Sequence, residues 1–221
     1  LKERGGFGML SKFVQLLFIS ILLIAFSFSF GEPPKYEGSQ TAYKQFVFAY
    51  TLLQRAQRSD HERDWKLASG AFDDFLGRYS QEGLVADALY YRALIAHLQN
   101  DHLLAAQFLV KAKKSVMVGD DLVQLLRGQV AVSLNRFDEV LTYLARIKMA
   151  NLDKNVQVTV WLTRAACHQK LGQPPKAVAC LESAVQLNCP LQARALLELG
   201  QLQASLDKLP EALDALDRCL A

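Results

Sequence analysis

The sequence lacks the motifs by which catalytic sites are usually recognised. It contains no nucleophile elbow, no phosphate-binding glycine loop and no metalloprotease helix. Histidine is scarce as well: of the four in the chain, His97 and His102 lie five residues apart across a predicted helix end, which is a poor spacing for metal ligands. His168 occupies a helical position where packing is the expected role. We therefore expect no enzyme activity, no bound metal and no cofactor.

An excess of charge of one sign is also absent from most of the chain. The net charge is +3, but three of the basic residues, Lys2, Arg4 and Lys12, precede the first long apolar run. From Glu32 onward, 22 basic residues face 21 acidic ones, which leaves +1. Such an even balance argues against nucleic acid or anionic lipid as a partner of the folded part.

Only one long apolar run occurs, from Phe13 to Phe30, and it ends before Gly31-Glu32-Pro33-Pro34. Basic residues, an apolar stretch and small residues before a helix breaker are the parts of a secretory signal peptide. An uncleaved membrane anchor is the alternative, because 18 residues are just enough to span a bilayer. We interpret residues 1–31 as a signal peptide or membrane anchor and residues 32–41 as a linker. Either interpretation places the folded part in the periplasm or cell envelope, anchored in the inner membrane if the run is retained.

The four cysteines are confined to the last third of the chain, and their spacing does not match a zinc site. They are Cys167, Cys180, Cys189 and Cys219. An exported protein meets oxidising conditions, so a disulfide between Cys167 and Cys180, which face each other across a predicted hairpin, is one interpretation. The other is that all four are small buried apolar residues.

Four segments within residues 84–221 repeat one spacing of small and apolar residues. Each has a small residue on a first predicted helix, and the four small residues are spaced by 35, 37 and 35 positions: Ala93, Gly128, Ala165 and Gly200. Turn-forming residues separate the two helices of each segment, at Asn100-Asp101, Asn135-Arg136, Gly172 to Pro175, and Asp207 to Pro210. The spacing predicts an all-α stack of antiparallel helical hairpins, with repeats at about 86–118, 121–153, 158–190 and 193–221.

This spacing resembles the tetratricopeptide repeat, whose pattern is Trp-x2-Leu-Gly-x2-Tyr, then Ala-x3-Phe, then Pro, over about 34 residues. The third segment carries it as Trp161-x2-Arg164-Ala165-x2-His168, then Ala177-x3-Leu181, with Pro190 after it. The resemblance implies an α-solenoid, the tetratricopeptide superhelix, that binds another protein and has no catalytic role of its own.

The chain departs from the family pattern at Arg92, Arg127 and Arg164, where the repeat has leucine. We expect these arginines to stack as a ladder. Their apolar stems would cover the core, and their guanidinium groups would reach solvent or an acidic partner.

Residues 42–82 are predicted to form a degenerate capping helix pair, Thr41 to Gln57 and Asp64 to Arg78, joined by a longer link than those of the later repeats. The run Phe72-x2-Phe75-Leu76-x2-Tyr79-Ser80, followed by Asp87-Ala88-x-Tyr90, resembles the tetratricopeptide repeats of bacterial envelope proteins. Those proteins serve outer-membrane assembly and cell-division coordination, so this second resemblance implies an envelope setting.

The concave wall of a repeat solenoid is built mainly from its first helices. On this register, the wall residues expected to bind a partner are Tyr90, Leu94, His97, Leu125, Gln129, Val132, Leu162, Gln169, Leu197 and Gln201. The apolar members favour an amphipathic helix or an extended peptide as the ligand. The Lys and Asn residues of the family's carboxylate clamp are missing, and a helix that covers the groove is the structural alternative.

Together these patterns predict an exported scaffold of the bacterial cell envelope that binds a protein or peptide in a partly apolar groove. The alternative is a self-associating structural region of a larger membrane-anchored protein. An enzyme subunit would need catalytic residues beyond the ends of this sequence, which begins with Leu1 rather than Met.

Overall fold

The computed structural model describes residues 38–113 and 115–220, and these residues form helices without any strand. The predicted signal peptide or anchor lies outside the described residues. The helices are α2 (Gln40–Ser59), α3 (Glu62–Arg78), α4 (Val85–Leu98), α5 (His102–Lys111), α6 (Asp120–Ser133), α7 (Phe137–Ala145), the 3-10 turn η1 (Met149–Asn151), α8 (Lys154–Lys170), α9 (Pro174–Val185), α10 (Gln192–Ser205) and α11 (Leu209–Leu220). The all-α prediction is confirmed for this part of the chain.

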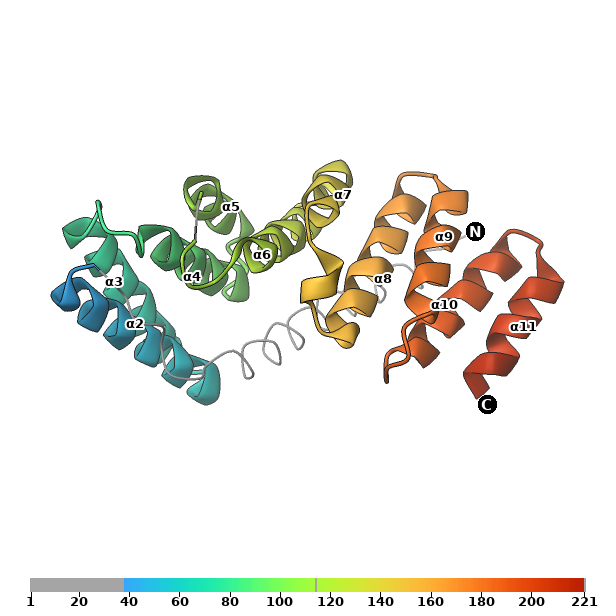
Figure 1. Ribbon diagram of the computed structural model, residues 1–221, viewed down its shortest axis with the longest axis horizontal. Helices are drawn as coiled ribbons and strands as arrows, with labels where there is room; N and C mark the ends of the chain where they lie inside the picture. Colours follow the sequence, from blue (N-terminus) through green and yellow to red (C-terminus); the bar gives the residue numbers. More distant parts are fainter. Residues whose placement is uncertain (1–37, 114, 221) are drawn as a thin grey trace, which may run out of the picture. The chain divides into compact units, whose positions relative to one another are not determined.

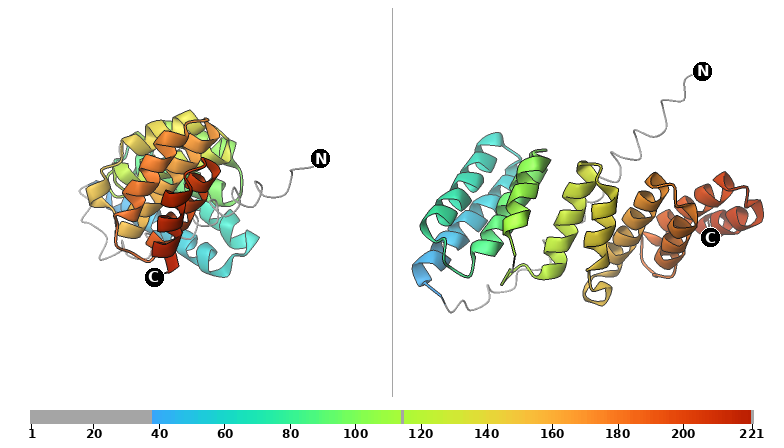
Figure 2. Two further views of the ribbon diagram at one scale, coloured as in Figure 1. Left: turned by 90° about the vertical axis from the view of Figure 1, so that its right-hand side faces the viewer. Right: turned by 90° about the horizontal axis from the view of Figure 1, so that it is seen from above.

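The helices belong to two compact units, which we call the N-terminal unit (described residues up to 134) and the C-terminal unit (residues 135–220). In the N-terminal unit, α2 pairs with α3 and α4 with α5, and each pair contacts the helix that follows it. In the C-terminal unit, α8 pairs with α9 and α10 with α11, as Figure 1 shows in orange and red. Seen from above in Figure 2, α8 to α11 follow one another along this unit. Each unit is therefore a stack of hairpins of the α-solenoid kind.

Five short links between consecutive helices each contain one residue in the left-handed backbone region. The φ angles are 50°, 65°, 57°, 68° and 60° at Asp60, Asn100, Asn135, Gly172 and Asp207 respectively. Glycine, asparagine and aspartate tolerate this region best, because glycine has no Cβ and the short polar side chains can bond locally. The four later turns lie where turn residues were predicted.

The first hairpin differs from its prediction, because its link is only Asp60 and His61. Asp60 turns the chain in the left-handed region, so the polar residues around it end one helix and begin the next instead of forming a long loop. The Trp65 indole N–H donates to Asp60 Oδ1 at 3.2 Å, and the Ser59 hydroxyl donates to Asp64 Oδ2 at 2.6 Å. This pair is as tight as the later hairpins.

An aromatic cluster fills the core of the N-terminal unit. The rings of Phe46 and Phe72 lie 6.0 Å apart edge to face, and the Phe72 and Tyr91 rings stack at 5.6 Å. All three side chains are buried. Such pairs add about 0.5–1.5 kcal/mol each to the free energy gained from apolar burial alone.

Small residues let the two helices of a hairpin approach, as the spacing predicts. Gly200 in α10 is the clearest case, since a Cβ built there would lie 2.8 Å from Leu216 Cγ in α11. Ala165 and Ala177 are fully buried in the corresponding positions of the preceding hairpin. A larger residue at Gly200 would push α11 away from α10.

The predicted arginine ladder is a set of clamps to the preceding hairpin. The Arg127 guanidinium in α6 donates to the carbonyls of Leu109 and Ala112, at the end of α5, at 2.8 and 3.0 Å. Arg164 in α8 donates likewise to the Leu144 carbonyl at the end of α7. Arg92 in α4 instead pairs with Asp73 of α3 at 2.8 Å. Arg127 and Arg164 thus supply donors to the last carbonyls of a helix, which lack partners within the helix and attract positive charge.

Candidate protein-binding face

The N-terminal unit buries most of the wall residues that the sequence predicts. Tyr90, Leu94, His97, Leu125 and Gln129 are all less than a tenth exposed, and Val132 is half-buried. The five buried side chains hold α4 and α6 in the fold and offer no surface to a ligand. The expectation of an apolar stripe along this part of the wall is therefore corrected: Tyr90, Leu94 and Leu125 are core residues.

The connection between α5 and α6 folds back onto α4 and is held there by Asp87. This carboxylate is fully buried, and its oxygens accept hydrogen bonds from the Ser115 hydroxyl and from three successive backbone N–H groups, those of Val116, Met117 and Val118. The three backbone bonds measure 2.9–3.0 Å. A buried carboxylate is stable only when it is bonded in this way. Asp87 therefore fixes the connection against the first helix of the second hairpin.

His97 and His102 face each other across the turn of the second hairpin. Their Nδ1 atoms are 3.1 Å apart, so one ring donates to the other. Burial lowers the pKa of His97 to about 4, and the nearby His102 adds to this effect. The left-handed turn at Asn100 brings the two rings together, which their sequence spacing alone did not indicate. No group of three metal-ligating side chains occurs among the described residues.

In the C-terminal unit, one side of α10, the first helix of the last hairpin, is open to solvent. Leu197 is 42% exposed, and Gln201, one turn further along, is exposed as well. On α8, the corresponding Leu162 is buried with 6% exposure, whereas Gln169 at the helix end is exposed. Of the predicted wall residues in this unit, Leu197, Gln201 and Gln169 are available for binding, and Leu162 is a core residue.

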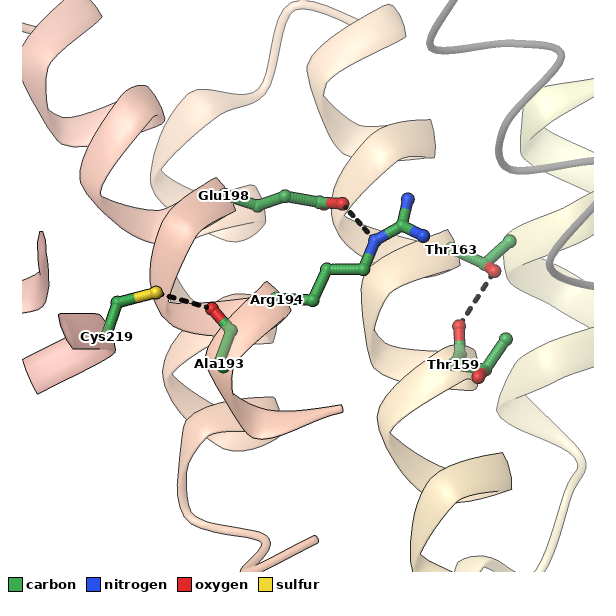
Figure 3. Close-up of polar contacts among 6 residues, drawn as sticks. All are labelled: Thr159, Thr163, Ala193, Arg194, Glu198 and Cys219. Atoms are coloured by element: carbon green, nitrogen blue, oxygen red, sulfur yellow. Dashed lines mark hydrogen bonds and ion pairs between the residues drawn. The ribbon is translucent and has the colours of Figure 1, made fainter. Parts of the chain in front are cut away.

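Arg194 and Glu198 complete a mixed surface on α10, which we call the α10 face (Arg194, Leu197, Glu198 and Gln201). Arg194 Nε donates to Glu198 Oε1 at 3.0 Å, and both side chains are about four-fifths buried. Figure 3 shows Arg194 reaching from α10 toward α8. A largely buried ion pair keeps its geometry better than an exposed one, so Arg194 and Glu198 give the α10 face a fixed polar border beside Leu197.

The hydroxyl groups next to this ion pair are occupied within their own helix. Thr163 donates to the Thr159 carbonyl at 2.8 Å, as Figure 3 shows, and Thr159 donates to the Asn155 carbonyl at 2.9 Å. Polar recognition on this side therefore rests on the α10 residues and not on α8.

Comparison with known proteins agrees with this hairpin architecture. The family model described as Tetratricopeptide repeat matches residues 163–221, which include α9, α10 and α11. Residues 163–221 therefore match the tetratricopeptide repeat, the pattern that the hairpins of this structure share. No curated protein matches its sequence.

Several solved structures share the tetratricopeptide fold of this chain. MamA 41-end from Desulfovibrio magneticus RS-1 superposes with a TM-score of 0.66 at 14% identity, covering 82% of this chain and 94% of that chain. YrrB, described as a TPR protein with an unusual peptide-binding site, gives 0.63 at 22% identity, covering 81% and 84%. A further crystal structure of MamA gives 0.61 at 15% identity, covering 75% and 91%. At these identities the likeness shows the fold alone.

The cysteines of the last two tetratricopeptide repeats are free thiols in the structure. Cys167 and Cys180 are buried, and burial raises the pKa of the Cys167 thiol to about 12, with Asp138 and Cys180 adding to the effect. Burial likewise raises the pKa of Cys180. The Cys219 thiol donates to the Ala193 carbonyl at 3.2 Å and so joins α11 to α10. Two of the four cysteines, Cys167 and Cys180, are thus buried free thiols, whereas Cys189 and Cys219 are only partly buried.

The repeat register places Asp87 and Arg194 on the concave wall without indicating what they bond to, and it gives Glu198 no role. The connection between α5 and α6 spans eight residues, from Ala112 to Gly119, and this length was the available signal that it folds onto a neighbouring helix. The spacing of Arg194 and Glu198 at i and i+4 was a second signal, since such pairs meet on a helix surface.

None of the helices in the described residues is both long and apolar enough to cross a membrane.

Proposed function

We propose that this tetratricopeptide repeat protein is an exported scaffold of the bacterial cell envelope. It binds a helix or an extended segment of a partner protein on the α10 face. The observation that carries the proposal is an exposed leucine, Leu197, set beside a largely buried ion pair on α10. Large apolar side chains flanked by fixed polar groups are typical of peptide-binding surfaces.

The proposed site is narrower than the groove expected from the sequence. Burial removes Tyr90, Leu94, Leu125 and Leu162 from the predicted surface, so binding concentrates on Leu197 and Gln201 of α10. The proposed setting rests on the basic start and apolar run of residues 1–31, the parts of an export signal. The same apolar run would provide any membrane association.

Site-specific photo-crosslinking tests the proposed site. A photoreactive residue at Gln201 is expected to capture one specific partner in envelope preparations. The same residue at Gln186, which is exposed at the end of α9 and outside the α10 face, is expected to capture none. Leu197→Glu should abolish capture at Gln201, because a carboxylate replaces the apolar centre of the contact.

Two controls make this experiment decisive. Val110→Glu changes an exposed apolar residue of α5, in the other unit, and should leave capture unchanged. Equal capture at Gln201 and Gln186, or capture that survives Leu197→Glu, would refute the assignment of the α10 face. A reporter that is active only outside the cytoplasm, fused after residue 37, tests export separately.

A further inference from the structure

The outer face of α11 is apolar and exposed. Leu209, Leu213 and Leu220 are 61%, 62% and 88% exposed, and their spacing of four and seven residues puts them on one side of the helix. The side of the helix that flanks this stripe, with Ala212 and Ala215, is buried. Three large leucines on one solvent-facing stripe are more than scattered surface exposure and indicate a contact surface.

The preceding hairpin, α8 with α9, shows which kind of helix packs against such a face. Val178 and Val185 of α9 follow the left-handed Gly172 at the same distances in sequence at which Leu213 and Leu220 of α11 follow the left-handed Asp207. Val185 is only 3% exposed and Val178 is partly buried, because both pack in the core that includes Ala195 of α10. The outer face of a second helix is therefore shaped to receive the first helix of another hairpin.

The outer face of α2 exposes an apolar residue at a position that the later hairpins bury. Phe48 lies twelve residues before Asp60, the left-handed residue that follows α2, and its side chain is 55% exposed. The residues at the same position in the four later first helices are exposed by at most 4%: Ala88, Val123, Val160 and Ala195. Each of these later helices contacts the second helix that precedes it. In the described residues, α2 has no such preceding helix.

The two faces also carry opposite charge. The α2 helix contains Lys44, Arg55 and Arg58 and no acidic residue, which makes +3. The α11 helix contains Glu211, Asp214 and Asp217 against Arg218, which makes −2. Arg55 remains 66% exposed although it pairs with Asp64, and Asp214 remains 69% exposed although it pairs with Arg218. Both charges therefore remain accessible to a partner.

We infer that α11 of one copy packs against α2 of a second copy and so repeats, between molecules, the contact that joins consecutive hairpins. The leucines of α11 cover Phe48, and the basic side chains of α2 lie beside the acidic ones of α11. The contact joins unlike surfaces, so further copies can add at both ends and form an open row. A symmetric α11–α11 pair is disfavoured because it brings two acidic helices together. The contact does not use the α10 face.

Mixing two blocked variants tests this head-to-tail contact. The full chain is purified in non-ionic detergent and labelled with a donor or an acceptor dye, and self-association is followed by energy transfer between copies. Leu213→Glu blocks the α11 face and Phe48→Glu blocks the α2 face. Each variant alone should associate at least about tenfold more weakly than the native chain, the change expected from placing one charge in the centre of an apolar contact.

A mixture of the two variants should recover energy transfer, because the intact α2 face of Leu213→Glu can still bind the intact α11 face of Phe48→Glu. The Val110→Glu control should associate like the native chain. Leu197→Glu should do the same, which separates this contact from partner binding on the α10 face.

Three results would overturn the inference. The first is a native chain that shows no concentration-dependent energy transfer. The second is association that Leu213→Glu abolishes and Phe48→Glu leaves intact, which would indicate α11–α11 pairing. The third is a mixture that stays dissociated although the native chain associates.

Discussion

Asp87→Asn is the substitution that most directly tests how the N-terminal unit is held closed. The native carboxylate is fully buried and accepts from four donors, the Ser115 hydroxyl and the backbone N–H groups of Val116, Met117 and Val118. Asparagine has nearly the same shape, but its amide nitrogen is a donor. In the native protein, Oδ2 accepts from the Val116 N–H. If the asparagine nitrogen takes the place of Oδ2, two donors face each other, and if the side chain moves away, one donor is left unpaired.

The expected cost follows from these contacts. Hydrogen bonds to a charged acceptor contribute about 1.5–3 kcal/mol, and a buried donor left unpaired costs about 1–3 kcal/mol, so we expect Asp87→Asn to lower the free energy of unfolding by about 3 kcal/mol. Ser115→Ala removes one donor of the four and should cost about 1 kcal/mol. Asp74→Asn alters an exposed carboxylate on α3 and should change stability by less than about 0.5 kcal/mol.

Urea unfolding followed by circular dichroism measures these differences, and amide hydrogen exchange locates them. The Val116, Met117 and Val118 amides should exchange slowly in the native chain and much faster in Asp87→Asn. If Asp87→Asn unfolds within about 0.5 kcal/mol of the native chain, or if the protection of these amides does not change, the buried carboxylate does not hold this connection.

Three other predictions follow from the fold. Arg127→Met should lower the free energy of unfolding by about 2 kcal/mol, because two carbonyls at the end of α5 lose a charged donor, whereas the exposed Arg146→Met should change it little in the same urea titration. Because the pKa of His97 is about 4 when folded and about 6.5 when unfolded, the unfolded chain binds protons first on acidification. Stability should therefore fall as the pH drops from 6.5 to 4, by about 3 kcal/mol in all, and His97→Gln should flatten this slope in unfolding curves measured across the range. A thiol reagent at pH 8 should modify Cys167 only after unfolding, since the side chain is 2% exposed and its pKa is about 12, and rapid labelling of Cys167 in the native chain would contradict its burial.

The hairpin architecture was predictable because local rules repeat along the chain. A small residue that recurs at a fixed distance from a turn-forming residue determines both where helices approach and where they end. Gly200 with its neighbour Leu216, and the left-handed Asn100 and Asn135, show these two rules in the structure. The same rules apply to the first hairpin, where polar residues around Asp60 suggested a long link but a left-handed residue makes a short one.

The candidate site was less predictable, because periodicity identifies a helix face without identifying what covers it. Tyr90 and Leu125 occupy the wall position of their repeats just as Leu197 does, yet only Leu197 is exposed. The difference depends on contacts between residues far apart in sequence, such as those from Asp87 to the residues around Met117. The arginines illustrate the same limit, since the helix end that Arg127 would reach depends on the packing of the preceding hairpin.

The clamps also make the junctions between hairpins respond differently to temperature. Arg127 and Arg164 join neighbouring helices through charged hydrogen bonds, whereas the last junction has Leu199 at the arginine position and a neutral Gln192 side chain that donates to the Val185 carbonyl. The stability of a repeat array is nearly a sum of single-repeat and nearest-neighbour terms. Apolar contacts weaken on cooling, so the neighbour coupling at the α9–α10 junction should decline in the cold before that at the arginine junctions. Loss of cooperativity at low temperature would then begin in the hairpin that carries both the α10 face and the exposed leucines of α11.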